Sequence, residues 1–270
     1  MPMMEEIRGL QEVILDILLD VSKVCREHKI PFYLGEGTLL GAVRHRGFIP
    51  WDDDIDIMMK RRDFERFLKV APEALGPAYE VQHPSTVENY WSTFIKVRLI
   101  KGHPEYRQKH IAHLTDHNGP YIDIFPLEYV PRADSLVQRM QSMGIKAFRG
   151  MLMFKLKAKP VKGMKARILD LTGHFFSIRS IHRIVDRLYK LQGRKEQPYI
   201  AAYSTYHPYR CMTVRKEVYD GVLWINFEGH KMPIPVGYDE LLTTIYGDYM
   251  TLPPEEKRVI KHHFKNGDAD

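Results

Sequence analysis

Four aspartates stand within five residues of the chain, in the stretch Pro50-Trp-Asp-Asp-Asp-Ile-Asp-Ile57. Side chains alternate between the two faces of a strand, so Asp52, Asp54 and Asp56 are expected to share one face while the two isoleucines point into a core. Three like charges at this spacing repel one another, which raises their pKa values or disrupts the strand unless a cation lies among them. Such hard oxygen ligands suit Mg²⁺ or Mn²⁺.

A second acidic position occurs in Tyr121-Ile-Asp-Ile-Phe-Pro126, where a strand that buries the two isoleucines presents Asp123 on its other face. A lone aspartate on a half-exposed strand is ordinary, and an acidic run in a surface turn is common. Together, however, Asp54, Asp56 and Asp123 supply the three carboxylates of a metal-dependent phosphoryl- or nucleotidyl-transfer site. Asp123 there binds metal or accepts the proton of an attacking hydroxyl.

A candidate phosphate-binding turn lies upstream of the aspartates. Gly37 and Thr38 open a predicted helix, where free backbone N–H groups favour an anion and Thr38 is expected to cap the helix. Arg44 and His45 follow about two turns later and add positive charge. Lys96 is predicted to face the same pocket from a strand, with exposure to solvent as the alternative. These five residues form the predicted donor-binding set, meaning the residues expected to bind the phosphates of the substrate that donates the transferred group.

Strand and helix patterns alternate in the first half of the chain, which indicates a mixed α/β core. The expected strands are 32–35, 55–59, 79–82, 94–100 and 121–125, the last closed by Pro126, with a hairpin of 222–227 and 231–234. The expected helices are 7–25, 39–44, one opening at 63–68, a basic helical stretch at 135–191, 238–246, and one opening at 253–254. We therefore expect a catalytic core in 1–134, a basic helical insertion in 135–200, and a segment completing the core in 201–270.

The net charge of +6 is concentrated in one segment. Residues 139–195 hold 15 lysines and arginines against two acids, whereas the rest of the chain is net acidic. Such a block meets phosphates or an anionic surface, or it is a solvated helical face. Its methionines and phenylalanines alternate with basic residues, as in an interfacial helix, so peripheral membrane contact through 135–195 is one hypothesis. A cap packed on the core is the favoured interpretation, because methionine stripes are usually core.

The location of the protein is also predicted by what the sequence lacks. Its two cysteines, Cys25 and Cys211, are far apart and give no disulfide framework, which favours a reducing compartment. No basic segment followed by an apolar one opens the chain, and no run of 18 apolar residues exists. We expect a cytoplasmic protein that works at the inner face of the membrane if its acceptor is lipid-linked.

The motifs together resemble a known family. The stretch Gly37-Thr-Leu-Leu-Gly-Ala-Val-Arg-His-Arg-Gly-Phe-Ile-Pro-Trp-Asp-Asp-Asp-Ile-Asp-Ile57 resembles the signature of LicD-type phosphocholine transferases. The similarity continues at 121–127, 235–242 and 246–254, and spans about residues 30 to 263. The fukutin-related transferases, which use CDP-ribitol, are similar as well.

This resemblance implies a nucleotidyltransferase-like mixed sheet flanked by helices, an α/β (α+β) fold with a mainly helical basic insertion. It implies metal-dependent transfer of phosphocholine from CDP-choline, or of a related alcohol phosphate from another CDP-alcohol, to a hydroxyl of a cell-surface glycan or teichoic-acid precursor, with release of CMP. Asp54 and Asp56 match the family's metal-binding pair and Asp123 its third carboxylate. Gly37 and Thr38 match its donor-phosphate turn.

Two other functions remain open from the sequence. A nucleotidyltransferase that moves NMP from an NTP onto a small molecule needs the same aspartates but releases pyrophosphate. A non-catalytic nucleic-acid-binding module could use the basic segment. That segment lacks the glycine and aromatic pattern of an RNA-recognition sheet, and the acidic cluster repels phosphate without a metal, so nucleic acid is not the expected partner.

Overall fold

The computed structural model describes residues 2–108, 111–158, 163, 169, 173–193 and 195–259, without the side chains of 2–6. The helices are α1 (Pro2–Glu27), α2 (Glu36–His45), α3 (Arg61–Ala74), α4 (Leu136–Lys155), α6 (Ile178–Tyr189) and α7 (Tyr238–Tyr246). The strands are β1 (Tyr33–Leu34), β2 (Asp56–Lys60), β3 (Tyr79–Gln82), β4 (Ile95–Leu99), β5 (Tyr121–Val130), β6 (Tyr199–Ala201), β7 (Thr213–Arg215), β8 (Val222–Phe227) and β9 (His230–Pro235). Short 3₁₀ helices span Pro104–Tyr106, Lys216–Tyr219 and Glu255–Lys257.

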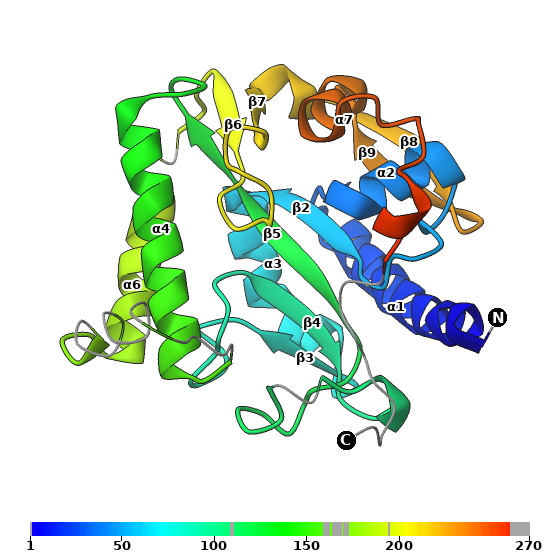
Figure 1. Cartoon of the computed structure of the whole chain (residues 1–270), viewed down its shortest axis with the longest axis horizontal. Coiled ribbons are helices and arrows are strands. Elements are labelled where there is room, and N and C mark those ends of the chain that lie inside the picture. The colour runs from blue at the N-terminus through cyan, green and yellow to red at the C-terminus, as the bar shows by residue number, and fades with distance from the viewer. Residues whose placement is uncertain are drawn as a thin grey trace.

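A seven-stranded mixed sheet forms the centre of the described structure, in the order β1-β2-β5-β4-β3, and β6 and β7 extend it from β5. Strands β2 and β5 run parallel, and β1, β4 and β6 join them antiparallel. Figure 1 shows β5 as the long diagonal strand, with α1 and α3 behind the sheet and α4 and α6 at one side. This sheet flanked by helices confirms the predicted α/β class; the division at residues 134 and 200 stays a prediction.

The main core lies where α1 and α3 pack on the sheet. Ile14 and Leu18 of α1 are fully buried, and so are Ile57 of β2 and Ile124 of β5. The apolar positions of α1 recur every three to four residues, which is the spacing that turns one helix face toward a sheet. The isoleucines beside the predicted site aspartates are therefore the residues that fix β2 and β5 in the core.

A second, smaller apolar cluster joins α4 and α6 to the sheet. The side chain of Gln141, near the start of α4, donates to the carbonyl of Leu188, near the end of α6, so the two helices run antiparallel. The favoured interpretation, in which the methionines of the basic segment pack on the core, is confirmed for Met151, which is buried in this cluster. It is wrong for Met140 and Met143, which are exposed. No helix in the described part of the chain combines the length and the hydropathy needed to cross a bilayer.

The sequence predicts that strand β5 ends before Pro126. In the structure β5 continues through Pro126 to Val130. The Asp123 N–H points toward β2, where it donates to Ile55, so an N–H at position 126 would point to the opposite side. On that side β4 pairs only up to Ile124 and β6 begins pairing at Glu128. Proline is tolerated because its missing N–H falls in the gap between two neighbouring strands.

Other local predictions hold closely. The hairpin of β8 and β9 turns through Glu228 and Gly229, both with positive φ, and α7 has the predicted bounds. The last predicted helix is observed as the 3₁₀ turn Glu255–Lys257, and residues from 260 onward lie outside the described ranges.

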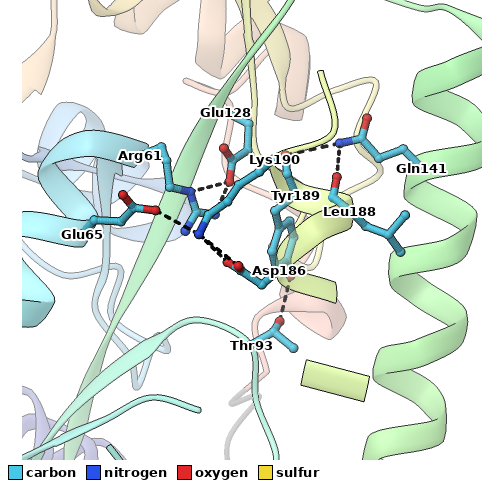
Figure 2. Close-up of polar contacts among 9 residues, drawn as sticks. All are labelled: Arg61, Glu65, Thr93, Glu128, Gln141, Asp186, Leu188, Tyr189 and Lys190. Carbon is cyan, nitrogen blue, oxygen red and sulfur yellow. Dashed lines mark hydrogen bonds and ion pairs between the residues drawn. The ribbon is translucent and has the colours of Figure 1, made fainter. Parts of the chain in front are cut away.

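A buried ion pair connects α3 with β5 beneath α6. The Nε of Arg61 donates to Oε1 of Glu128 at 2.8 Å, and both side chains are nearly inaccessible. Figure 2 shows Lys190 beside this pair, in contact with Glu65 at 3.0 Å and Asp186 at 2.8 Å. Burial raises the pKa of Glu128, and Arg61 opposes that rise, so each charge depends on the other for compensation.

We expect Glu128→Ala to lower the free energy of unfolding by about 3–5 kcal/mol, because it leaves the Arg61 charge buried without its partner. Urea denaturation followed by circular dichroism measures the effect. Glu12→Ala, which removes the exposed i,i+4 pair with Arg8, is the matched control and should cost less than about 1 kcal/mol. The apolar double variant Arg61→Met/Glu128→Leu should recover most of the loss; equal losses in the single and double variants would contradict a buried-charge effect.

Candidate functional site

Asp56 and Asp123 lie side by side on the parallel strands β2 and β5, as direct register partners. Neighbouring strands are about 4.8 Å apart, and in-register residues of a parallel pair project from the same face of the sheet. Both side chains are buried. The structure thus brings together two predicted carboxylates that are far apart in the sequence.

The turn before β2 adds a compact group of carboxylates. One carboxylate oxygen from each of Asp52, Asp53 and Asp54 lies within 4.8 Å of the other two. The turn is held by Gln11 of α1, whose Nε2 donates to the Asp52 carbonyl at 2.8 Å. The expected alternation along a strand is wrong here, because β2 begins only at Asp56 and the preceding residues are irregular, so Asp53 joins the group instead of pointing away.

The charges of these groups act on one another. The pKa of Asp56 is raised well above its ordinary value, first by burial and then by the negative charges of Asp54, Glu36, Asp123 and Asp52. Glu36, at the first position of α2, is a buried carboxylate that the sequence analysis did not identify. Repulsion of this kind favours either protonation or a cation among the carboxylates.

The glycine turn lies against this acidic group. A Cβ on Gly37 would stand 2.5 Å from Oδ2 of Asp52, so the absence of a side chain lets that carboxylate approach α2. Gly35 is the N-cap residue, which corrects the predicted capping role of Thr38. The Thr38 hydroxyl instead accepts the N–H of Asp56 at 2.9 Å and connects α2 with the start of β2.

Lys96 contacts the site from β4, and the alternative of exposure to solvent is wrong. Its Nζ is 2.6 Å and 2.9 Å from the two carboxylate oxygens of Asp123 and 3.6 Å from the centre of the Tyr121 ring. Burial lowers the pKa of Lys96, and the Asp123 charge opposes this effect. Arg98, which follows Lys96 by two residues on β4, is also fully buried and donates hydrogen bonds to Gln82 and Gln108.

Arg44 and His45 lie in the last turn of α2, at the end opposite to Gly37. Arg44 donates through Nη1 to the Tyr249 carbonyl at 2.7 Å, and the His45 ring meets the Trp51 ring at 6.4 Å. Burial lowers the pKa of both basic groups. In this structure Arg44 holds the C-terminal segment against α2 and His45 contacts Trp51, and their predicted contact with donor phosphates stays a prediction.

The C-terminal part of the chain also reaches the site, which the residue patterns did not reveal. Burial raises the pKa of the Tyr246 hydroxyl, as do the negative charges of Glu36 and three of the aspartates. The Tyr246 ring packs edge-on against His207, from the segment between β6 and β7, at 5.2 Å. The Tyr246 side chain of α7 therefore lies near the acidic group, with His207 packed against it.

The arrangement combines a dense group of carboxylate oxygens with one carboxylate held by a buried ammonium. Carboxylates so close together can hold a hard divalent cation. A carboxylate beside them can orient a hydroxyl or accept its proton. These are the requirements of phosphoryl or nucleotidyl transfer.

Comparison with known proteins identifies the family of the chain. Residues 29–168 match the family model described as LicD/FKTN/FKRP, nucleotidyltransferase domain. The chain is 32% identical over 268 residues to the lipopolysaccharide cholinephosphotransferase LicD of Haemophilus influenzae, which covers 95% of this chain and 96% of that protein. Uncharacterized proteins of Rickettsia typhi and Rickettsia prowazekii are 36% and 34% identical over 67 residues, 25% of this chain and 22% and 25% of theirs. The family match includes all the carboxylates described above.

We expect Asp56→Asn to stabilise the protein at neutral pH in the presence of EDTA. A carboxyl whose pKa is raised on folding contributes stability below its ordinary pKa and loses it as pH rises through the folded-state pKa. The gain in melting temperature should be about 2–4 °C for each kcal/mol of repulsion relieved, and should fade as the pH is lowered.

Thermal unfolding across a pH series measures this effect, with Asp16→Asn on the exposed face of α1 as the control. Addition of Mg²⁺ should raise the melting temperature of the unsubstituted protein more than that of Asp56→Asn. An Asp56→Asn variant less stable than the unsubstituted protein at every pH in EDTA would show that repulsion does not dominate at this position.

Proposed function

Because the chain belongs to the LicD family of transferases, we propose that it transfers phosphocholine, or a related alcohol phosphate, from a CDP-linked donor to a hydroxyl of a cell-surface glycan precursor and releases CMP. The observation that carries this proposal is the in-register pair Asp56 and Asp123 beside the turn of three aspartates. Choline as the alcohol is supported by the similarity to the Haemophilus influenzae cholinephosphotransferase along nearly the whole chain.

The acidic group fits a divalent cation such as Mg²⁺ or Mn²⁺. Asp52, Asp53 and Asp54 place carboxylate oxygens within 4.8 Å of one another, and burial and the neighbouring negative charges raise the pKa of Asp56. We assign the cation to Asp54 and Asp56, with Asp123 as the third carboxylate and Asp52 and Asp53 close by. When bound, the cation supplies positive charge that offsets the carboxylates and the pyrophosphate of the donor.

The chain's own residues position the reactants in this proposal. The first turn of α2 presents the N-terminal end of a helix, which favours a donor phosphate. Thr38 connects that turn to the Asp56 backbone through its 2.9 Å hydrogen bond, so the proposed phosphate-binding turn is held beside the start of β2. Gly37 seats Asp52 against the same turn.

Asp123 accepts the proton of the acceptor hydroxyl. The hydroxyl oxygen then forms the new bond to the phosphorus that carries the alcohol, and the bond from that phosphorus to CMP breaks. Lys96 donates to both oxygens of Asp123, so it places a counter-charge beside the carboxylate and holds it in a fixed position. Positioning and charge compensation supply most of the catalysis, as in phosphoryl transfer generally.

The first test asks which donor binds and what is released. CDP-choline with Mg²⁺ should raise the melting temperature more than CDP-ribitol, CDP-glycerol or CTP, and turnover with a glycan acceptor should yield CMP. Asp56→Asn and Asp123→Asn should each reduce the rate by about 10³-fold or more, because each removes a group that acts in the transition state. Pyrophosphate released from CTP would favour the NMP-transfer alternative and reject the phosphocholine proposal.

A second test concerns Lys96. We expect Lys96→Met to lower kcat by about 10²-fold or more, because the substitution leaves Asp123 without its fixed partner, whereas Lys96→Arg should retain part of the activity. Lys60→Met, at the far end of β2 and paired with Asp220, is the matched control and should leave kcat unchanged. A Lys96→Met enzyme with full kcat would remove the lysine from the proposed mechanism.

A further inference from the structure

In the first two turns of α4, apolar side chains face outward and polar side chains face the interior of the protein. Leu136, Val137, Met140 and Met143 have exposed fractions of 72%, 51%, 65% and 71%. The polar residues between them point inward instead: Gln138, Gln141 and Ser142 are 0%, 1% and 5% exposed. A helix on a water-exposed surface normally shows the opposite arrangement. An exposed apolar face of this kind is typical of a site that binds another molecule.

The reversed orientation is fixed by hydrogen bonds of the buried polar face. Gln141 donates to the Leu188 carbonyl at 2.6 Å and accepts from the Tyr203 hydroxyl at 3.1 Å and from Gln192 at 2.5 Å. Gln138 and Ser135 form a capping box at the start of the helix. Rotation of α4 to hide its apolar face would break the hydrogen bonds that Gln141 makes with Leu188, Tyr203 and Gln192, each of which stabilises the present orientation.

A further exposed apolar residue lies just after α6. Leu191 is 56% exposed and precedes Gln192, which is bonded to Gln141 of α4. We define the apolar patch by Leu136, Val137, Met140 and Met143 on α4 and by Leu191 after α6. Unbranched methionines suit a surface without fixed shape, because their side chains adapt to it.

Exposed arginines lie on α6, the helix that packs beside α4. Arg179, Arg183 and Arg187 recur every fourth residue along the exposed face of α6, and Arg187 lies one turn before Leu191. Across the described ranges, no ion pair to these three arginines is found. In the sequence, the segment 139–195 holds 15 basic residues against two acidic ones. An occupant of the patch therefore has to be anionic at its surface and apolar beneath it.

We propose that the apolar patch docks on an anionic lipid bilayer, with its methionines and leucines at the level of the acyl chains and the α6 arginines on the headgroups. This combination of apolar and basic residues is that of an interfacial helix. A second copy of the chain fits less well, because a symmetric contact would bring the two arginine rows together. The proposal goes beyond the proposed function and does not rest on it.

Flotation of the purified chain with vesicles tests the proposal directly. The chain should bind vesicles of phosphatidylethanolamine and phosphatidylglycerol at low salt, and bind phosphatidylcholine vesicles much less. Met140→Asp/Met143→Asp and Arg183→Glu/Arg187→Glu should each weaken binding by about tenfold or more. Two matched variants should retain it: Met140→Leu/Met143→Leu keeps the apolar face, and Lys23→Glu/Arg26→Glu makes the same charge change on α1.

Several outcomes would overturn the proposal. They are failure of the unsubstituted chain to bind, equal binding to neutral vesicles, and full binding by Met140→Asp/Met143→Asp. A dimer in solution that this variant dissociates, without vesicle binding, would assign the patch to a second copy. Turnover of a water-soluble acceptor should be the same in all four variants, so failure of the membrane proposal is separable from failure of the proposed function.

Discussion

Repulsion among buried carboxylates is the constraint on which the rest of the site depends. Asp56 is buried beside Asp123, and Asp54, Asp52 and Glu36 act on it as well. The fold holds Asp56 there through groups that are not charged: the fully buried Ile57 follows it on β2, and the Thr38 hydroxyl fixes its backbone N–H. The apolar core thus stabilises an arrangement that the carboxylates alone would oppose.

The two register partners have different surroundings in spite of their shared position. Asp123 is held by the Lys96 ammonium at 2.6 Å, whereas the surroundings of Asp56 are dominated by burial and negative charge. Carboxylates whose environments differ in this way can take different tasks in one reaction. This asymmetry supports the division of roles proposed above, with Asp56 toward the cation and Asp123 toward the acceptor hydroxyl.

The sequence predicted what local patterns determine and missed what distant segments contribute. The hairpin, α7 and β3 were predicted with nearly their observed bounds, because each is set by its own residues. Asp54, Asp56 and Asp123 could be picked out by their alternation with isoleucine. Glu36 and Tyr246 could not, because no periodic pattern marks a side chain that reaches the site through the tertiary fold. Thr38 was assigned a cap because the partner of its hydroxyl, 18 residues away, is not visible in a local motif.

The charges on β5 also bear on how the sheet avoids misfolding. Asp123 contacts Lys96 on one face of the strand, and Glu128 contacts Arg61 of α3. An odd separation of five residues puts these two acids on opposite faces. A slip of β5 by one residue against its neighbours would drive both into surroundings without a counter-charge, while its isoleucines turned outward. Each of the two acids therefore raises the free energy of a sheet in which β5 is paired out of register.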